Sequence, residues 1–298
     1  MVASFECNLS EKTVNPIGRR MRPFFMDYGL FFKIANTGND TKAGHRCPIQ
    51  IAYRLWQFSK DRCISESSFY VRPDEPIVAC SAIYCGITED LLKSPDITVL
   101  PLEEAISGTS RLIQKVGNKN IYIIGWDVPE DTLGVLENNA ERLNIDTFDI
   151  QKLKIIDLKK LADLSLPINE TGHLGPDTAL FWLEKKVNNS SDNDAFKFLA
   201  NIRTSRWQEK FCMTTLDMDL MILKRFMSFL NLRTIDEVYT WLDTPHKIEV
   251  LPFGKHKGEL ISDVYVKDNE YLCWLYSCKD IMDKNKDLKF MLDSLFSV

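Results

Sequence analysis

The sequence has few histidines and lacks the cysteine spacings that hold zinc. It has four histidines and eight cysteines, and no two cysteines form a C-x-x-C pair. Because a structural zinc site needs pairs of ligands at close spacing, the sequence disfavours such a site. Most of the cysteines stand beside apolar residues, which is typical of small buried thiols in a reducing compartment.

Long apolar runs and an excess of positive charge are lacking too. No run approaches the ~18 residues that a membrane span requires, and the first residues show no basic region followed by an apolar core. We therefore expect an intracellular protein, cytoplasmic or in the nucleoid or nucleus, with no membrane partner. The formal net charge of -5 argues against a protein that coats nucleic acid through bulk charge, although local contacts stay open.

The chain is long enough for more than one unit. At ~150 residues per domain, a length of 298 residues predicts one large domain and a smaller one. The polar stretch NNSSDND at 188–194 is the best candidate for a boundary. We predict an N-terminal extension at 1–22, a main domain at 23–187, a linker and helical connector at 188–245, and a C-terminal module at 246–298.

Apolar runs separated by turn residues predict a sheet covered by helices. The expected strands are 23–35, 48–58, 67–71, 121–124 and 154–157, with a further strand at 248–253 in the C-terminal module. Helices are expected from Thr88, over 102–116, 133–143 and 178–187, and through most of 195–243. The first three strands read as an antiparallel meander, and the order of strands and helices predicts an α+β or α/β sheet covered by helices, of which we favour α/β.

Acidic residues cluster directly after the strand at 121–124. This strand ends at Gly125, and Asp127, Glu130 and Asp131 follow before a helical pattern begins. Ligand sites of α/β sheets lie at such strand ends, and hard divalent cations prefer carboxylate oxygens. A metal would be held at this point of the chain.

The order of these signals resembles the DEDD superfamily of 3'-5' exonucleases, in the group that includes the bacterial proofreading subunit and exonuclease X. The resemblance covers roughly residues 24–187. It rests on a series of short motifs in the same order: Thr37-Gly38, PIQIA at 48–52, RPDEPI at 72–77, CGITEDLLKSP at 85–95, IIGWDVPED at 123–131, IIDLKKLA at 155–162 and GHLGPDTA at 172–179. It implies an RNase H-like mixed sheet flanked by helices, followed by a helical connector and a small C-terminal α+β module.

The family hydrolyses phosphodiesters with two divalent ions, Mg2+ or Mn2+, which four carboxylates hold. Asp131 and Asp177 match the third and fourth of these carboxylates, so the resemblance implies that both are catalytic residues and metal ligands. His173 matches the family's general base loosely, because it lies four residues before Asp177 where the family usually has five.

The first strand departs from the family, which has an Asp and a Glu there, one residue apart. Alignment on the Thr-Gly turn puts Lys33 at the aspartate position and Ala35 at the glutamate position. Alignment on FFMDYG at 24–29 keeps Asp27 but puts Gly29 at the glutamate position. We favour the first register, which also gives the usual distance to Gln50, and in both registers the glutamate is missing.

In the first register an ammonium group stands where a ligand shared by both metals belongs. At an effective dielectric constant of ~20 and a separation of ~4 Å, the repulsion is about 4 kcal/mol per unit charge, so metal occupancy should collapse. Lys33 could instead neutralise Asp131 and Asp177, leaving a cleft held by an ion pair.

A second resemblance lies in LPFGKHKGELISDVYVKDNEYLCWLY at 251–276, which is similar to the small module appended to exonuclease X-like proteins. Two glycines bracket Lys255, His256 and Lys257, a turn whose amides and cations could cradle a phosphate. Trp126 has two readings, a wall of the core or cleft and a platform on which a base stacks.

These observations predict a nucleic-acid-binding protein that resembles a 3'-5' exonuclease and is catalytically degenerate. Its expected partner is single-stranded nucleic acid or a 3' end, with protein partners in a nucleic-acid-processing complex. One alternative is an active enzyme with Mg2+ or Mn2+ bound by Asp27, Asp131 and Asp177 and a further acid such as Asp40 or Asp127. The other alternative is a scaffold subunit of a replication or transcription assembly, which needs no cofactor.

Overall fold

The computed structural model describes residues 27–38, 46–166, 175–206 and 211–297, of which 203–206 are described by their backbone alone. The predicted N-terminal extension, Asp40 and His173 therefore lie outside the described residues. The chain divides into two compact units, Met1–Tyr239 and Thr240–Val298. Among the described helices, none has the length and apolar character that a membrane crossing requires.

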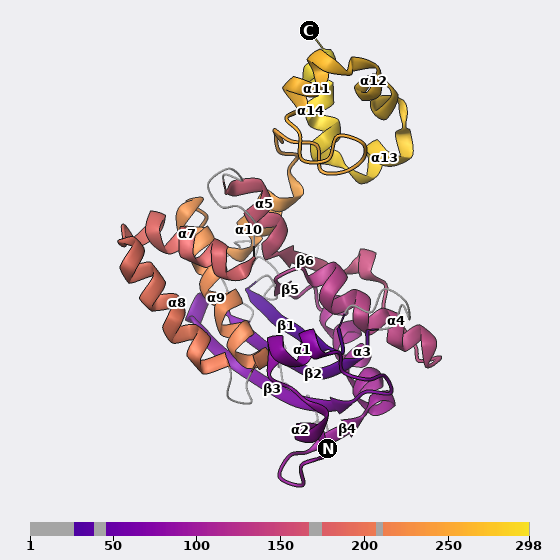
Figure 1. Cartoon of the computed structure of the whole chain (residues 1–298), viewed down its shortest axis with the longest axis vertical. Helices are drawn as coiled ribbons and strands as arrows, with labels where there is room; N and C mark the ends of the chain where they lie inside the picture. Colours follow the sequence, from indigo (N-terminus) through magenta and orange to yellow (C-terminus); the bar gives the residue numbers. More distant parts are fainter. Residues whose placement is uncertain (1–26, 39–45, 167–174, 207–210, 298) are drawn as a thin grey trace, which may run out of the picture. The chain divides into compact units, whose positions relative to one another are not determined.

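The first unit is built on a six-stranded mixed sheet with the order β4-β3-β2-β1-β5-β6 (Figure 1). The strands are β1 (Tyr28–Asn36), β2 (Pro48–Gln57), β3 (Arg62–Arg72), β4 (Val99–Pro101), β5 (Tyr122–Gly125) and β6 (Lys154–Asp157). The strands β1, β2 and β3 form the predicted antiparallel meander, and β5 and β6 continue the sheet in parallel beyond β1. This arrangement confirms the predicted RNase H-like mixed sheet.

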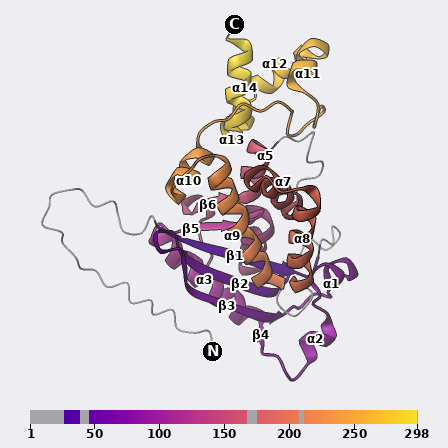
Figure 2. The same ribbon diagram turned by 90° about the vertical axis from the view of Figure 1, so that its left-hand side faces the viewer.

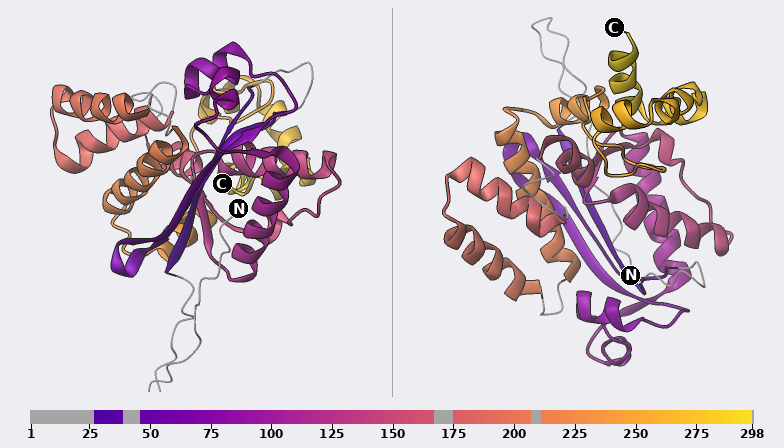
Figure 3. Two further views of the ribbon diagram at one scale, coloured as in Figure 1. Left: turned by 90° about the horizontal axis from the view of Figure 1, so that it is seen from below. Right: turned by 45° about the horizontal axis from the view of Figure 1, so that its top comes forward.

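Helices cover both faces of this sheet (Figures 2 and 3). The helices of the unit are α1 (Ala79–Cys85), α2 (Glu89–Lys93), α3 (Leu102–Asn118), α4 (Gly134–Arg142), α5 (Leu158–Ser165), α7 (Pro176–Asn188), α8 (Asp192–Arg206), α9 (Phe211–Phe229) and most of α10 (Ile235–Asp243). On one face, α3 and α4 share a core with Leu30, Phe32 and Ile34 of β1. Because side chains alternate along a strand, Phe31, Lys33 and Ala35 face the other side, where α9 packs on β1 and β2.

The predicted helical connector is instead an integral part of the first unit. Helix α9 packs against α7, α8 and the sheet, and the side chains of Leu216, Ile222 and Phe226 on it are fully buried. The polar stretch at 188–194 is the turn between α7 and α8, where Asn189 ends α7 in the left-handed conformation. A tight turn and a domain linker have the same polar composition, so the two units divide at residue 240 rather than near 190.

The second unit is helical. Its helices are α11 (Ile261–Lys267), α12 (Asn269–Ser277), α13 (Lys279–Lys284) and α14 (Lys286–Phe296). They enclose a small core that includes Leu251, Leu272 and Leu292. The strand predicted at 248–253 is reduced to a single antiparallel bridge between Val250 and Leu260, because Pro252 has no N–H group with which to continue a ladder.

Candidate functional site

A cleft of about 380 Å³ opens at the C-terminal ends of β1 and β5. The charged side chains that line it are Lys33, Asp127, Asp131 and Lys159. Its remaining walls include Ala35, Asn36, Ser81, Tyr84, Cys85, Trp126, Phe211 and Thr215, and the Gly175-Pro176 segment that opens α7. The cleft thus lies where the sequence predicts a site, at the end of the strand that carries the acids.

The parallel pairing of β1 with β5 places the residues of the two predicted registers at different ends of the sheet. Gly29 lies opposite Tyr122 at the start of β5, and Phe31 lies opposite Ile124 near its end. Continuing along β1, Lys33 and Ala35 reach the cleft. Asp27 lies six residues before Lys33, about 20 Å away at the rise of an extended strand, so it is too far from Asp131 to share a metal with it.

Asp27 and Gly29 have local roles at the other end of β1. The Asp27 carboxylate accepts a hydrogen bond from the Ser59 N–H group at 2.7 Å, which closes the turn between β2 and β3. A side chain at Gly29 would overlap Ile124 and Phe58. The structure therefore brings together Lys33, Ala35 and Asp131, and it does not bring Asp27 or Gly29 to them.

The end of β5 requires a glycine. A methyl group on Gly125 would lie 2.9 Å from Val128 Cγ2 and 3.0 Å from the Phe32 carbonyl oxygen. It would also approach the carboxylate of Asp219 to 3.4 Å, and Asp219 is fully buried on α9. Because the backbone turns sharply here, Asp127 adopts the left-handed conformation with φ of 55°.

Asp127 is bound to residues of β6 and α5. Lys159 Nζ donates to Asp127 Oδ2 at 2.9 Å, and the Asp127 N–H group donates to Asp157 Oδ1 at 2.9 Å. Asp157 Oδ1 also accepts from the Lys159 N–H group at 3.0 Å and so caps the N-terminus of α5. Burial raises the pKa of Asp157 to about 6, and the charge of Asp127 adds to this effect.

Asp131 lies on a π-helical turn, Val128–Leu133, which leads from the cleft into α4. Such turns are frequent at functional sites. Its carboxylate is paired with Arg46, whose Nη1 donates to Asp131 Oδ1 at 2.7 Å. One interpretation of the sequence has Lys33 neutralise this carboxylate; in the structure the cation paired with it is Arg46.

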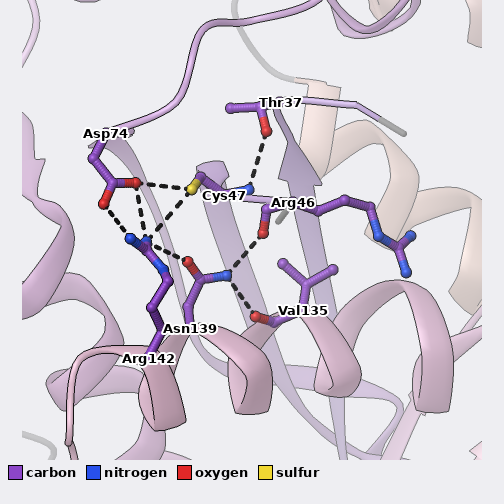
Figure 4. Close-up of polar contacts among 7 residues, drawn as sticks. All are labelled: Thr37, Arg46, Cys47, Asp74, Val135, Asn139 and Arg142. Atoms are coloured by element: carbon purple, nitrogen blue, oxygen red, sulfur yellow. Dashed lines mark hydrogen bonds and ion pairs between the residues drawn. The ribbon is translucent and has the colours of Figure 1, made fainter. Parts of the chain in front are cut away.

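The backbone of Arg46 is held in place from α4 (Figure 4). Asn139 is 2% exposed, and its Nδ2 donates to the carbonyl oxygens of Arg46 and Val135, both at 2.8 Å. The Arg46 side chain extends away from Asn139. The next residue, Cys47, donates its N–H group to Thr37 Oγ1 at 3.0 Å, which ties the start of β2 to the end of β1.

The Cys47 thiol belongs to the same network. Its Sγ donates to Asp74 Oδ1 at 3.0 Å, and Arg142 Nη2 donates to the same oxygen at 3.0 Å. Burial and the nearby carboxylate raise the pKa of Cys47 to about 12, so the thiol stays protonated. Cys47 therefore acts as a hydrogen-bond donor in the frame that fixes Arg46, and it is not a nucleophile.

Asp177 follows the two cleft-lining residues at the start of α7. Gly175 precedes this helix, Pro176 is its first residue and Asp177 its second, a position that favours both a proline and an acid. Asp177 itself is not among the residues that line the cleft. His173, the predicted general base, is outside the described residues.

Three aromatic residues, Tyr84, Trp126 and Phe211, contribute to the apolar surface of the cleft. Trp126 is 7% exposed, so it forms a wall of the cleft. Tyr84 on α1 is 63% exposed and makes an edge-to-face contact with Phe211, with the ring centroids 5.2 Å apart. Tyr84 was not predicted from the sequence, since an aromatic residue in a short helix after two prolines carries no periodic signal.

The described residues do not fit a pair of divalent ions. No group of three or more His, Cys, Asp or Glu side chains among them is arranged to hold a metal. None of the four residues of β1 that line the cleft, Lys33, Ile34, Ala35 and Asn36, is acidic, and the Asp131 carboxylate already has Arg46 as its cation. Divalent ions of a two-metal site are held by carboxylate oxygens that several acids contribute.

The basic turn of the second unit is largely neutralised within that unit. His256 is 8% exposed, and its two ring nitrogens lie 2.8 Å from Glu259 and 2.8 Å from Asp268. Lys255 Nζ donates to Asp268 at 2.8 Å, and the two basic groups lower the pKa of Asp268 to about 2. Lys257 is exposed. Two of the three predicted phosphate-binding groups thus support the turn itself.

No family model and no curated protein matches the sequence.

Several solved structures are similar to this chain. The zinc-bound complex of E. coli exonuclease I with single-stranded DNA has a TM-score of 0.48 and 16% identity. This match covers 72% of this chain and 43% of that one. A complex of the same enzyme with a dT13 oligonucleotide has a TM-score of 0.48 and 14% identity, over 73% of this chain and 44% of that one. The nuclease domain of 3'hExo, a DEDDh family member bound to rAMP, has a TM-score of 0.42 and 12% identity, over 70% of this chain and 94% of that one. The match thus spans less than half of exonuclease I.

Proposed function

We propose that this protein is a catalytically degenerate relative of the 3'-5' exonucleases that binds single-stranded nucleic acid through its cleft. The observation that carries the proposal is the set of charges there. Lys33 replaces the acid on β1 that would bridge two metals, and Arg46 neutralises Asp131. At an effective dielectric constant of ~20, a fixed ammonium ~4 Å from a dication costs about 4 kcal/mol per unit charge, so these cations and a metal pair exclude one another.

The shape and the side chains of the cleft support binding of a nucleotide. Its volume of about 380 Å³ is in the range of sites for small organic ligands. The exposed ring of Tyr84 offers a stacking surface, and Lys33 offers a positive charge nearby. Stacking on an aromatic ring combined with a cation for the backbone is how proteins bind single strands without reading sequence.

The direct test incubates the full chain with end-labelled single-stranded DNA and RNA, in Mg2+, in Mn2+ and in chelator. The expected result is a mobility shift in all three conditions with no shortening of the strand. Metal-dependent shortening that disappears in Asp131→Ala would show an active enzyme. If the protein neither shifts nor shortens the strands, the proposed binding of nucleic acid is wrong and the scaffold alternative remains.

A matched control separates the cleft from the rest of the surface. Asp27 lies at the far end of β1 from Asp131 and has a comparable charge. If shortening is seen and Asp27→Asn reduces it as much as Asp131→Ala does, the activity does not come from this cleft.

A further inference from the structure

One of the charged side chains that line the cleft, Lys33, has no ion pair among the described residues. Of the four charged side chains that line the described cleft, three are in ion pairs: Asp127 with Lys159, and Asp131 with Arg46. Lys33 is the fourth, and the structure records no ion pair for it among the described residues. Because each acid has its own cation, the ammonium of Lys33 is the charge that the cleft can offer to a ligand.

The surroundings of Lys33 favour an anion. The residue is half-buried on β1, and its positive charge lies close enough to Cys212 on α9 to lower the pKa of that thiol against the effect of burial. Asn36 also lines the cleft, and its Oδ1 already accepts from the Gly38 N–H group at 3.0 Å, so the amide offers its Nδ2 donor. An ammonium and an amide donor in a partly desolvated cleft form charge-assisted hydrogen bonds with phosphate oxygens.

We infer that Lys33 takes the place of the metal ions and binds the phosphate of a nucleoside monophosphate group without any divalent cation. This inference rests on the proposed function and names the ligand of the same site. The phosphate would contact Lys33, and the base would lie toward Tyr84 and Trp126. The group could be a free nucleotide or the terminal nucleotide of a strand, since both present the same chemistry.

The test measures calorimetric binding of a nucleoside monophosphate and of the nucleoside without phosphate to the full chain in chelator. A hydrogen bond to a charged group contributes ~1.5–3 kcal/mol, so the monophosphate should bind at least about tenfold more tightly than the nucleoside. Equal binding of the two, or binding that needs Mg2+ or Mn2+, overturns the inference with no variant required.

Two variants assign the effect to Lys33. Lys33→Met keeps the length of the side chain and removes the charge, so the preference for the monophosphate should fall about tenfold, whereas Lys33→Arg should retain most of it. Lys93→Met is the control, because Lys93 is exposed on α2 and lies outside the cleft lining. An unchanged preference in a folded Lys33→Met protein overturns the inference.

A single-stranded oligonucleotide with a 3'-hydroxyl distinguishes the two sources of the phosphate. If the strand competes with the monophosphate, and Lys33→Met lowers the salt dependence of strand binding by about one ion, the site takes the end of a strand. If the monophosphate binds and the strand does not, the inference stands and the proposed function fails. If the strand binds and Lys33→Met changes nothing, the proposed function stands and the inference fails.

Discussion

Arg46 Nη1 donates to Asp131 Oδ1 at 2.7 Å, across 85 residues of sequence. The pair is partly exposed, with the two side chains 27% and 44% accessible, so it contributes little to the stability of the fold, ~0–1 kcal/mol. Its importance is electrostatic. It supplies an internal positive charge to a carboxylate that lines the cleft.

Placing two acids on β1 in the cleft should create metal binding. In Lys33→Asp with Ala35→Glu, two carboxylates replace an ammonium and a methyl group in the cleft beside Asp131. We expect Mn2+ or Mg2+ to raise the melting temperature of this variant and not that of the parent, since a ligand at ~100 times its Kd stabilises by about 2.7 kcal/mol. Adding Arg46→Ala should increase the shift by releasing Asp131 from its ion pair.

The control for this experiment is a pair of acids at the other end of the same strand. Carboxylates introduced beside Asp27 instead of in the cleft should give no metal-dependent shift, because no further acid of the site is within reach there. A shift of equal size in both double variants would mean that the metal binds to surface carboxylates.

Local signals predicted the sheet well. The strand at 154–157, the cap at Thr88 and the turn at Gly125 are each encoded by a few neighbouring residues, and the structure has them at those positions. The sequence order of the motifs also placed Lys33 and Asp131 at one site, and both residues line the cleft.

Contacts between distant segments were not predictable in the same way. Arg46 follows a stretch of sequence rich in Gly, Asn, Asp and Lys, and nothing near it in the sequence indicates that its guanidinium reaches Asp131. The polar turn at 188–194 could not be told from a linker, because only the burial of α9 shows that the chain returns to the sheet after it.

Asn139 should be the residue that holds Arg46 most firmly. Its Nδ2 donates to two carbonyl oxygens, and its Oδ1 accepts from Arg142 Nη2 at 3.0 Å. Asn139→Ala leaves these buried groups without their partner, so the free energy of unfolding should fall by about 1–3 kcal/mol in a urea titration. The adjacent Asn138 is exposed on the same helix, and Asn138→Ala should change the free energy of unfolding by ~0.5 kcal/mol or less. Equal unfolding midpoints for the two variants would contradict this role.

Asp157 should make the protein less stable as the pH rises from about 4 to about 6. Its pKa is about 6 in the folded state and ~3.9 in an unfolded chain, so in this window the folded state holds a proton that the unfolded state has lost. Above that window the buried charge destabilises the fold, by about 2–3 kcal/mol at ~1.4 kcal/mol per pH unit.

Asp157→Asn isolates this effect, because an asparagine oxygen can still accept from the N–H groups of Asp127 and Lys159. The variant and the parent should have the same melting temperature near pH 4, and the variant should be the more stable near pH 7. Asp157→Ala loses both hydrogen bonds and should be less stable than Asp157→Asn at every pH. A parent as stable as Asp157→Asn at pH 7 would contradict the raised pKa.

The two glycines of the basic turn in the second unit should differ in their tolerance of a methyl group. Both are in the left-handed region, Gly254 with φ of 84° and Gly258 with φ of 83°. An alanine at Gly258 meets open space, so it should cost only the ~1–2 kcal/mol of the backbone conformation. An alanine at Gly254 would also overlap the Tyr271 hydroxyl, and Tyr271 packs against His256 with ring centroids 5.1 Å apart. Displacing Tyr271 should add roughly 1–3 kcal/mol to the cost.

Hydrogen exchange of peptides from 246–297 in the full chain measures this difference. Exchange should be faster in Gly254→Ala than in Gly258→Ala. Equal rates in the two variants would mean that Tyr271 moves aside freely and that the His256 cluster does not depend on it.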